Sequence, residues 1–153
     1  MKEKAPSPPL PALPPHTKIA IVRSSWHEEL TRSMEEGAKR ILSEAGVHDV
    51  MTLIVPGAFE IPLACQKVIR ENRMAGVVAL GVIIQGQTHH AGEIARACTD
   101  GIMHVMLETG IPIAHGVLFT DSLAHAEARA LGISNKGSDV ATTLLRMVAF
   151  KRA

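Results

Sequence analysis

Hydrophobic residues occur along the chain in short apolar runs that alternate with longer segments of helical spacing. Four runs rich in β-branched residues predict strands at residues 18–22, 51–55, 76–84 and 111–118. Apolar positions three and four residues apart predict helices over residues 27–46, 60–71, 90–109, 121–131 and 138–150. Gly46 and Gly110 stand at or just beyond the ends of two of these helices, where glycine commonly terminates a helix.

Strands that alternate with helices, and that are apolar almost throughout, indicate a parallel sheet covered on both faces. Right-handed crossovers then give an α/β protein, a three-layer α/β/α sandwich with a four-stranded parallel sheet, doubly wound like flavodoxin. The length of 153 residues fits a single domain, which we expect over residues 18–153. Six prolines between Pro6 and Pro15 predict that residues 1–17 form an extended arm without a core of its own.

Composition excludes several classes of protein. Hydrophobic residues make up 46% of the chain, which excludes a disordered protein, and no apolar run reaches the ~18 residues of a membrane span. The net charge of +1, from 16 basic and 15 acidic residues, gives no electrostatic basis for binding nucleic acid. The proline-rich start does not resemble a signal peptide, and the isolated Cys65 and Cys98 predict buried, reduced thiols. We therefore expect a cytoplasmic protein.

The less common residues cluster where the predicted strands end. In a doubly wound sheet, ligands bind beyond the carboxyl ends of the strands. These ends carry the segments RSSW (23–26), PGAFE (56–60), QGQTHH (85–90) and FTD (119–121). Turns and helix caps account for their glycine and hydroxyl residues. They do not account for Trp26 and Phe59, which we interpret as aromatic walls for a planar ligand.

The segment from Gly86 to His90 opens a predicted helix, whose first N–H groups favour an anion. A phosphate or carboxylate at Gln87 and Thr88 is one interpretation; an ordinary capped helix start is the other, and on the loop alone it is favoured. Adjacent side chains of a helix point in different directions, so His89 and His90 cannot both bind one metal ion. No HExxH or CxxC spacing is present, and we expect no metal site. A single histidine here suits proton transfer.

Taken together, these motifs resemble those of the 6,7-dimethyl-8-ribityllumazine synthase family. The resemblance extends from Lys18 to about Phe150, and rests on SSW, VPGAFEIP, ALGVIIQGQTHH, LETGIPIAHGVLFTD and NKG. It implies a transferase of riboflavin biosynthesis that condenses 5-amino-6-(D-ribitylamino)uracil with 3,4-dihydroxy-2-butanone 4-phosphate. The product would be 6,7-dimethyl-8-ribityllumazine, with release of phosphate and water, and the resemblance implies no cofactor.

The resemblance also implies a role for each matching residue. His90, the second of the paired histidines, matches the proton-transfer residue of the family, and His89 occupies a variable position. Positions that contact the pyrimidine and the ribityl chain correspond to Trp26, Ala58, Phe59, Glu60, Val82, Ile83, Ile84, His115 and Lys136. Positions that bind the phosphate correspond to Gly86, Gln87, Thr88 and, from a neighbouring subunit, Arg129.

The chain departs from the family pattern at four positions. Ala91 and Gly92 stand where an aromatic residue and an aspartate are usual, and Gln85 stands where a basic residue is frequent. His115 replaces an asparagine or phenylalanine beside the pyrimidine. We expect these changes to affect the rate and the pH profile more than activity itself.

Oligomerisation and two alternative functions complete these expectations. A phosphate site that needs Arg129 from a neighbour predicts a ring, and the resemblance sets it at five subunits. The short link before Lys136 is similar to that of members whose pentamers assemble into sixty-subunit icosahedral shells, and riboflavin synthase is a candidate protein partner. A flavodoxin-like FMN carrier would share the fold but would not need Arg129 and Lys136. A non-catalytic flavin-binding or shell-forming member of the family is the second alternative.

Overall fold

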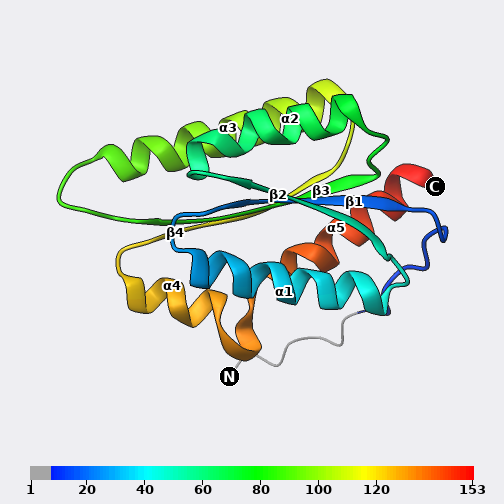
Figure 1. Cartoon of the computed structure of the whole chain (residues 1–153), viewed down its shortest axis with the longest axis horizontal. Coiled ribbons are helices and arrows are strands. Elements are labelled where there is room, and N and C mark those ends of the chain that lie inside the picture. Colours follow the sequence, from blue (N-terminus) through cyan, green and yellow to red (C-terminus); the bar gives the residue numbers. More distant parts are fainter. Residues whose placement is uncertain (1–7) are drawn as a thin grey trace.

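The computed structural model of the protein describes residues 8–153. Its elements alternate as the sequence predicts (Figure 1). In chain order they are β1 (Lys18–Ser24), α1 (Glu28–Glu44), β2 (Asp49–Val55), the 3-10 turn η1 (Ala58–Glu60), α2 (Ile61–Glu71), β3 (Gly76–Ile84), α3 (His90–Thr109), β4 (Ile113–Thr120), α4 (Leu123–Ala130), the 3-10 turn η2 (Gly132–Ser134) and α5 (Lys136–Arg152).

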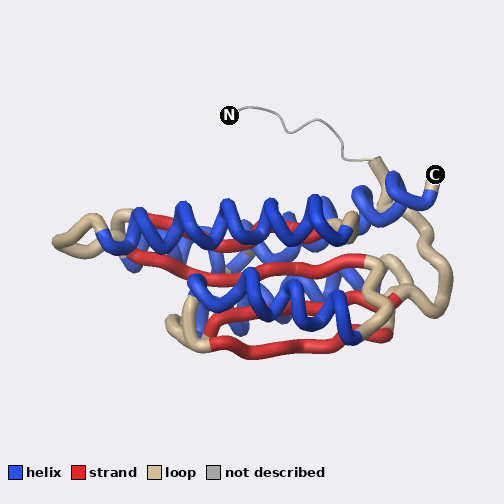
Figure 2. The backbone as a smooth tube through the Cα atoms, turned by 90° about the horizontal axis from the view of Figure 1, so that it is seen from above, coloured by secondary structure: helices blue, strands red, loops and turns tan. Residues whose placement is uncertain are grey.

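The four strands form one parallel sheet in the order β2-β1-β3-β4. Helices α2 and α3 cover one face, and α1, α4 and α5 cover the other (Figure 1). Figure 2, which looks at the molecule from above, shows the strands side by side behind the helices of one layer. The predicted three-layer α/β/α sandwich with a four-stranded parallel sheet is therefore confirmed.

Two apolar clusters fill the spaces between the layers, because alternate residues of each central strand point to opposite faces. On the α1 side, Ile19 and Ile21 of β1 pack with Met34 and Leu144. On the α2 side, Ala20 and Val22 of β1 belong to the second cluster, whose helical members include Ile61, Cys65, Cys98 and Ile102. Every residue of β3 except Ile84 is buried, as its continuous apolar sequence predicts.

Element boundaries differ from the predicted ones by a few residues, for identifiable reasons. β4 begins at Ile113 instead of residue 111, because Pro112 has no N–H to donate, although its carbonyl accepts from Val77 N at 3.0 Å. α5 begins at Lys136 instead of residue 138, because the Asn135 side chain accepts from Ser138 N and caps the helix. Gly46 and Gly110 adopt the left-handed conformation predicted for residues that end helices.

The described part of the proline-rich segment, residues 8–15, contains neither a helix nor a strand. The segment contacts α5, because Arg146 of this helix donates to the carbonyl of Pro8 at 2.8 Å. Leu10 and Leu13 are partly buried against the cluster on the α1 side. Residues 1–7 of the expected arm lie outside the described residues. Within the described chain, no helix is long and apolar enough to cross a membrane.

Candidate active site at the carboxyl ends of the strands

The loops after β1, β2 and β3 surround a cavity of about 440 Å³ at the carboxyl end of the sheet. In Figure 1 this end lies at the left, where the loop between β3 and α3 projects beyond the strands. Ten of the residues singled out in the sequence line the cavity, namely Trp26, Ala58, Phe59, Glu60, Val82, Ile83, Ile84, Gly86, Thr88 and His90. The remaining lining residues are His27, Pro56, Gly57, Ala91 and Ile94.

Trp26 is presented to solvent by a well-bonded loop. Its backbone N–H donates to the carbonyl of Pro56 at 3.2 Å, and Ser25 N donates to the carbonyl of Val55 at 2.7 Å. These bonds join the loop after β1 to the end of β2 and the loop that follows it. The indole itself is 71% exposed, which leaves an aromatic face available for stacking.

Glu60 and Phe59 belong to the short turn η1, which also lines the cavity. One carboxylate oxygen of Glu60 accepts from Gly57 N at 3.1 Å, which fixes the direction of the side chain. A Cβ atom on Gly57 would lie 3.2 Å from that oxygen and 3.9 Å from the Trp26 ring. Glycine at this position therefore leaves the space in which the Glu60 carboxylate lies. Phe59 is 59% exposed and adds a second aromatic surface.

The loop between β3 and α3 contributes backbone N–H groups in addition to the Thr88 side chain. Gln85 N donates to the carbonyl of Thr120, and His90 N contacts Thr88 Oγ1 at 3.4 Å. Within residues 8–153, the N–H groups of residues 86–89 have no hydrogen-bond acceptor. Unpaired N–H groups at a helix start are the donors that an anion needs. Gln87 is exposed and does not line the cavity.

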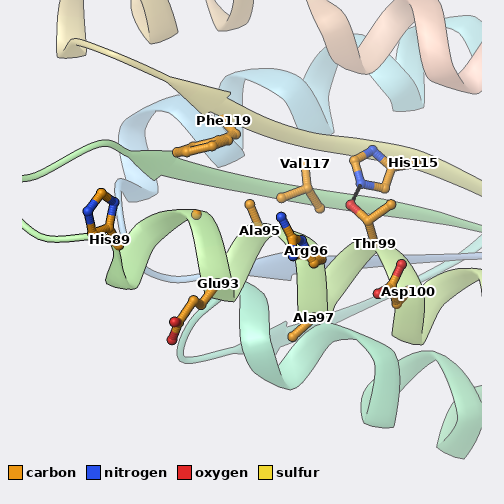
Figure 3. A pocket seen from close by; sticks show the side chains of 11 residues that line it. His89, Glu93, Ala95, Arg96, Ala97, Thr99, Asp100, His115, Val117 and Phe119 are labelled. Carbon is orange, nitrogen blue, oxygen red and sulfur yellow. Dashed lines mark hydrogen bonds between the residues drawn. The ribbon is translucent and has the colours of Figure 1, made fainter.

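The paired histidines face different spaces. His90 lines the cavity that contains Trp26, and His89 lines a separate groove between α3 and β4 (Figure 3). The two side chains therefore line different spaces. Among the described residues, no group of three or more histidine, cysteine, aspartate or glutamate side chains could hold a metal ion.

His115 lies in this second groove, which has a volume of about 870 Å³ and is separated from the first cavity by the start of α3. Its Nε2 atom is 2.9 Å from Thr99 Oγ1 of α3 (Figure 3). Partial burial of the ring lowers the pKa of His115, and the positive charge of Lys136 acts in the same direction. Phe119 lies on the same face of β4, and Phe119 Cζ is 3.9 Å from where a Cβ atom on Gly92 would stand.

Arg129 and Lys136 are remote from the cavity within one subunit. They belong to α4 and α5, which cover the sheet face opposite to α3 (Figure 1). Arg129 is exposed, and its Nη1 atom donates to the carbonyl of His125 at 3.0 Å. One subunit therefore does not bring Gln87, His115, Arg129 or Lys136 into the cavity that the other predicted residues line.

The model of the family described as 6,7-dimethyl-8-ribityllumazine synthase matches residues 16–152. The chain belongs to this family. A 6,7-dimethyl-8-ribityllumazine synthase of Xanthomonas oryzae pv. oryzae is 38% identical over 138 residues, which cover 88% of this chain and 90% of the relative. The Bdellovibrio bacteriovorus protein of the same name is 41% identical over 132 residues, which cover 86% and 73% of the two chains. The sequence-based identification of a lumazine synthase family transferase in riboflavin biosynthesis is thus confirmed.

One solved structure has a similar arrangement of backbone elements but does not bear on the family assignment. A GDP-L-fucose synthetase from Naegleria fowleri bound to NADP aligns with a TM-score of 0.47 at 12% identity, covering 97% of this chain and 48% of the other. A structural similarity with so low a TM-score and sequence identity supports no conclusion about function.

Five residues that line the cavity of this lumazine synthase family member were not predicted from the sequence as site residues. Pro56 and Gly57 are part of the PGAFE motif, and Ile94 lies one helical turn after His90, so that sequence position could have indicated all three. His27 follows Trp26 directly and adopts a left-handed backbone with φ of 55°, a conformation that is uncommon outside glycine but that histidine, asparagine and aspartate adopt more often than other residues. Ala91, which departs from the family pattern inferred from the sequence, also lines the cavity.

A buried ion pair lies just before the first loop and was not predicted either. Arg23, 4% exposed, donates from Nε to Glu35 Oε2 at 2.5 Å. Burial acts to raise the pKa of Glu35, but hydrogen bonds from Lys39, Thr52 and Arg23 outweigh it and hold the pKa below its usual value. The pair joins the end of β1 to α1 and so fixes where the Trp26 loop begins.

Both cysteines are free and buried, as the sequence predicts. Burial raises the pKa of Cys65 to about 12, with a further contribution from Cys98, and raises the pKa of Cys98 to about 11. A thiol with so high a pKa stays protonated at neutral pH, and a protonated thiol is a poor nucleophile. Neither side chain reaches the cavity.

Proposed function

We propose that the protein condenses 5-amino-6-(D-ribitylamino)uracil with 3,4-dihydroxy-2-butanone 4-phosphate to give 6,7-dimethyl-8-ribityllumazine, phosphate and water. The observation that carries the proposal is the common cavity of Trp26, Phe59, Glu60 and His90. It combines aromatic surfaces, a fixed carboxylate and a titratable ring within one space. This combination matches the needs of a planar, polyhydroxylated substrate that must exchange protons as it reacts.

The pyrimidine ring would stack on Trp26, whose exposed indole supplies a planar apolar surface. Val82, Ile83 and Ile84, at the end of β3, would contact the heterocycle from the sheet side. The ribityl hydroxyls would donate to Glu60, whose carboxylate already accepts from Gly57 and so is held in one direction. Ala58 and Phe59 would enclose the same chain of carbons.

The phosphate of the second substrate would bind at the start of α3. Unpaired N–H groups at residues 86–89 and the positive end of the α3 dipole both favour an anion there. Gly86 leaves room for the ligand, because a Cβ atom built on it meets no atom within 4 Å. Gln87 and Thr88 would complete the loop, with Thr88 contributing a hydroxyl.

The reaction begins when the 5-amino group of the pyrimidine attacks the ketone, and loss of water gives an imine. Elimination of phosphate and closure of the second ring, with loss of a second water molecule, then produce the lumazine. His90 would carry protons between these steps, because it lines the same cavity as Trp26, Gly86 and Thr88. Much of the acceleration is expected from holding two substrates side by side.

The proposed site is shared between subunits of a homopentamer. Arg129, Lys136 and His115 belong to surfaces that one subunit cannot bring to its own cavity, yet phosphate binding by a guanidinium calls for direct contact. A rotation-related neighbour would place these three residues against the cavity, which closes a ring of subunits. Assembly of such rings into an icosahedral shell, a cytoplasmic location and riboflavin synthase as partner remain further expectations of the family resemblance.

The test is to mix the purified protein with both substrates and to follow the fluorescence and absorbance of the lumazine. Lumazine formation above the uncatalysed rate, with one phosphate released for each product, is the expected result. A protein that binds riboflavin or lumazine but gives no rate above background would instead be a non-catalytic member of the family. That outcome would overturn the proposed reaction while leaving the binding site in place.

A further inference from the structure

The link between α4 and α5 is exposed, whereas the residues on either side of it are held by hydrogen bonds to α1. Gly132, Ile133 and Ser134 of η2 are all exposed, and Ile133 has no measurable burial at 105%. Packing of the link itself therefore cannot determine how α4 is oriented relative to α5. Arg129 stands one residue before the end of α4, and Lys136 is the first residue of α5.

Ser33, on α1, contacts both sides of this link. Its hydroxyl donates to the carbonyl of Ala130, the last residue of α4, at 2.9 Å. Its carbonyl accepts from Asn135 Nδ2, immediately before α5, at 2.8 Å. Asn135 is only 7% exposed, and its Oδ1 atom accepts from Ser138 N at 3.3 Å. One residue of α1 thus joins the end of one helix to the start of the next.

Two glycines allow this close approach of α5 to α1. A Cβ atom on Gly137 would lie 1.8 Å from the carbonyl oxygen of Met34, a backbone atom that cannot move aside. A Cβ atom on Gly37 would lie 2.4 Å from Asn135 Oδ1 and would displace the asparagine. Lys136 is therefore held between two residues, Asn135 and Gly137, that are both fixed against α1.

We propose that Ser33 and Asn135 are positioning residues, which fix Arg129 and Lys136 relative to each other so that both reach one substrate-bearing cavity. The inference rests on the proposed function, in which these two cations approach the substrates of a neighbouring subunit. It assigns the Ser33–Asn135 pair a task distinct from catalysis, because neither residue lines the cavity. A guanidinium gains from bidentate pairing with phosphate only when its direction is fixed beforehand, so small displacements of α4 weaken phosphate binding.

The direct test is the steady-state kinetics of Ser33→Ala. Loss of the bond to Ala130 should raise KM for the phosphate substrate about 2- to 10-fold, the factor that corresponds to one hydrogen bond, with a smaller change in kcat. Ser33→Thr keeps a hydroxyl and should restore most of the wild-type KM. Ser134→Ala, in the exposed link, is the matched control and should leave both constants unchanged. An equal change in Ser33→Ala and Ser134→Ala would overturn the proposal.

A double-mutant cycle separates positioning from a general loss of structure. If Ser33 acts through Arg129, then Ser33→Ala should change KM for the phosphate substrate in the wild type but not in an Arg129→Ala background. Additive effects would overturn the positioning role while leaving the proposed reaction intact. An Arg129→Ala variant with wild-type KM would instead contradict the role proposed for Arg129, and would overturn the positioning role with it. A wild type that forms no lumazine would overturn both proposals.

Asn135→Ser provides a second, independent variant. Serine can still cap α5 but is too short to reach the Ser33 carbonyl, so the folded state should persist. Its thermal midpoint should lie close to that of the wild type, whereas KM should rise for the pyrimidine or the phosphate substrate as Lys136 loses its fixed position. Unchanged KM values for both substrates in a folded Asn135→Ser protein would contradict the role of Asn135.

Discussion

Thr99 Oγ1 lies 2.9 Å from His115 Nε2, which joins helix α3 to the edge strand β4 across the groove beside the candidate active site. The contact fixes one ring nitrogen of the histidine. Because burial of the ring and the charge of Lys136 lower the pKa of His115, the imidazole is neutral at physiological pH.

This lowered pKa predicts how stability depends on pH. The usual pKa of histidine is 6.5 and the folded chain holds His115 below it, so the unfolded chain binds more protons between the two values. The contribution of His115 to the free energy of unfolding is therefore full above about pH 6.5 and is lost as the pH falls from there through the lower pKa of the folded state. Urea unfolding of wild type and His115→Asn from about pH 5 to 8 should show the steeper acid loss in the wild type. Identical pH slopes for the two proteins would refute the prediction.

His90→Ala should slow lumazine formation by up to about 10²-fold, the lower range for an acid–base group, and His89→Ala should change the rate much less. The reason is that only His90 lines the cavity with Trp26, while His89 faces the groove beside β4. Residual activity is expected because imines form and phosphate leaves without assistance. Single-turnover rates measured for both variants decide the matter, and equal losses would contradict the assignment to His90.

Trp26→Ala should weaken binding of the pyrimidine substrate and of riboflavin by about 1–3 kcal/mol, the magnitude of one stacking contact. Trp26 is the single tryptophan of the chain, so its fluorescence should fall as ligand binds. Titration of the wild type gives the affinity, and calorimetry provides it for the variant. Phe150→Ala is a suitable control, because Phe150 is 72% exposed on α5 and does not line the cavity. Unchanged fluorescence at saturating ligand would exclude Trp26 from the site.

Gly86→Ala should weaken binding of the phosphate substrate without lowering the stability of the fold. Gly86 does not have a positive φ, and a Cβ atom there meets nothing within 4 Å, so stability should be unchanged or raised by about 0.4–1 kcal/mol. KM for the phosphate substrate should nevertheless rise, because the methyl group occupies space proposed for the ligand. Gly110→Ala is the opposite control: its φ of 68° predicts lower stability with an unchanged KM. A KM at the wild-type value in Gly86→Ala would count against phosphate binding at this loop.

Subunit mixing should test whether the site is shared. His90→Ala and Arg129→Ala, each with low activity alone, should recover part of the activity when they exchange subunits, because some interfaces then combine both native residues. Exchange itself is followed with subunits of different mass tags. If exchange is complete and the activity of the mixture equals the mean of its components, both residues act within one chain and the shared site is wrong.

The sequence predicted the layered fold well because strand and helix periodicities are local properties of the chain. It did not predict the order of the strands, since nothing in residues 51–55 distinguishes an edge strand from a central one. Ile54, for example, is 57% exposed on β2 although its neighbours in sequence are apolar. Similarly, the start of β4 at Ile113 depends on which N–H groups find partners, and not on apolar character.

The candidate site was predictable where short motifs carry it, and hidden where distant segments meet. Trp26, Glu60 and Gly86 lie in contiguous motifs at strand ends, and the fold brings them to one cavity. The contact of Ser33 with Ala130 and Asn135 spans about a hundred positions, so no local pattern indicates it. The Arg23–Glu35 pair was missed for the same reason, because a charged residue at the end of a buried strand has no periodic signature.

That ion pair has a consequence for how the protein responds to heat. Desolvation of buried charges becomes less unfavourable as temperature rises, whereas the stabilisation gained per unit of buried apolar surface levels off. The junction between β1 and α1, fixed by Arg23 and Glu35, should therefore retain its geometry in a warm cell better than junctions fixed by apolar contacts alone.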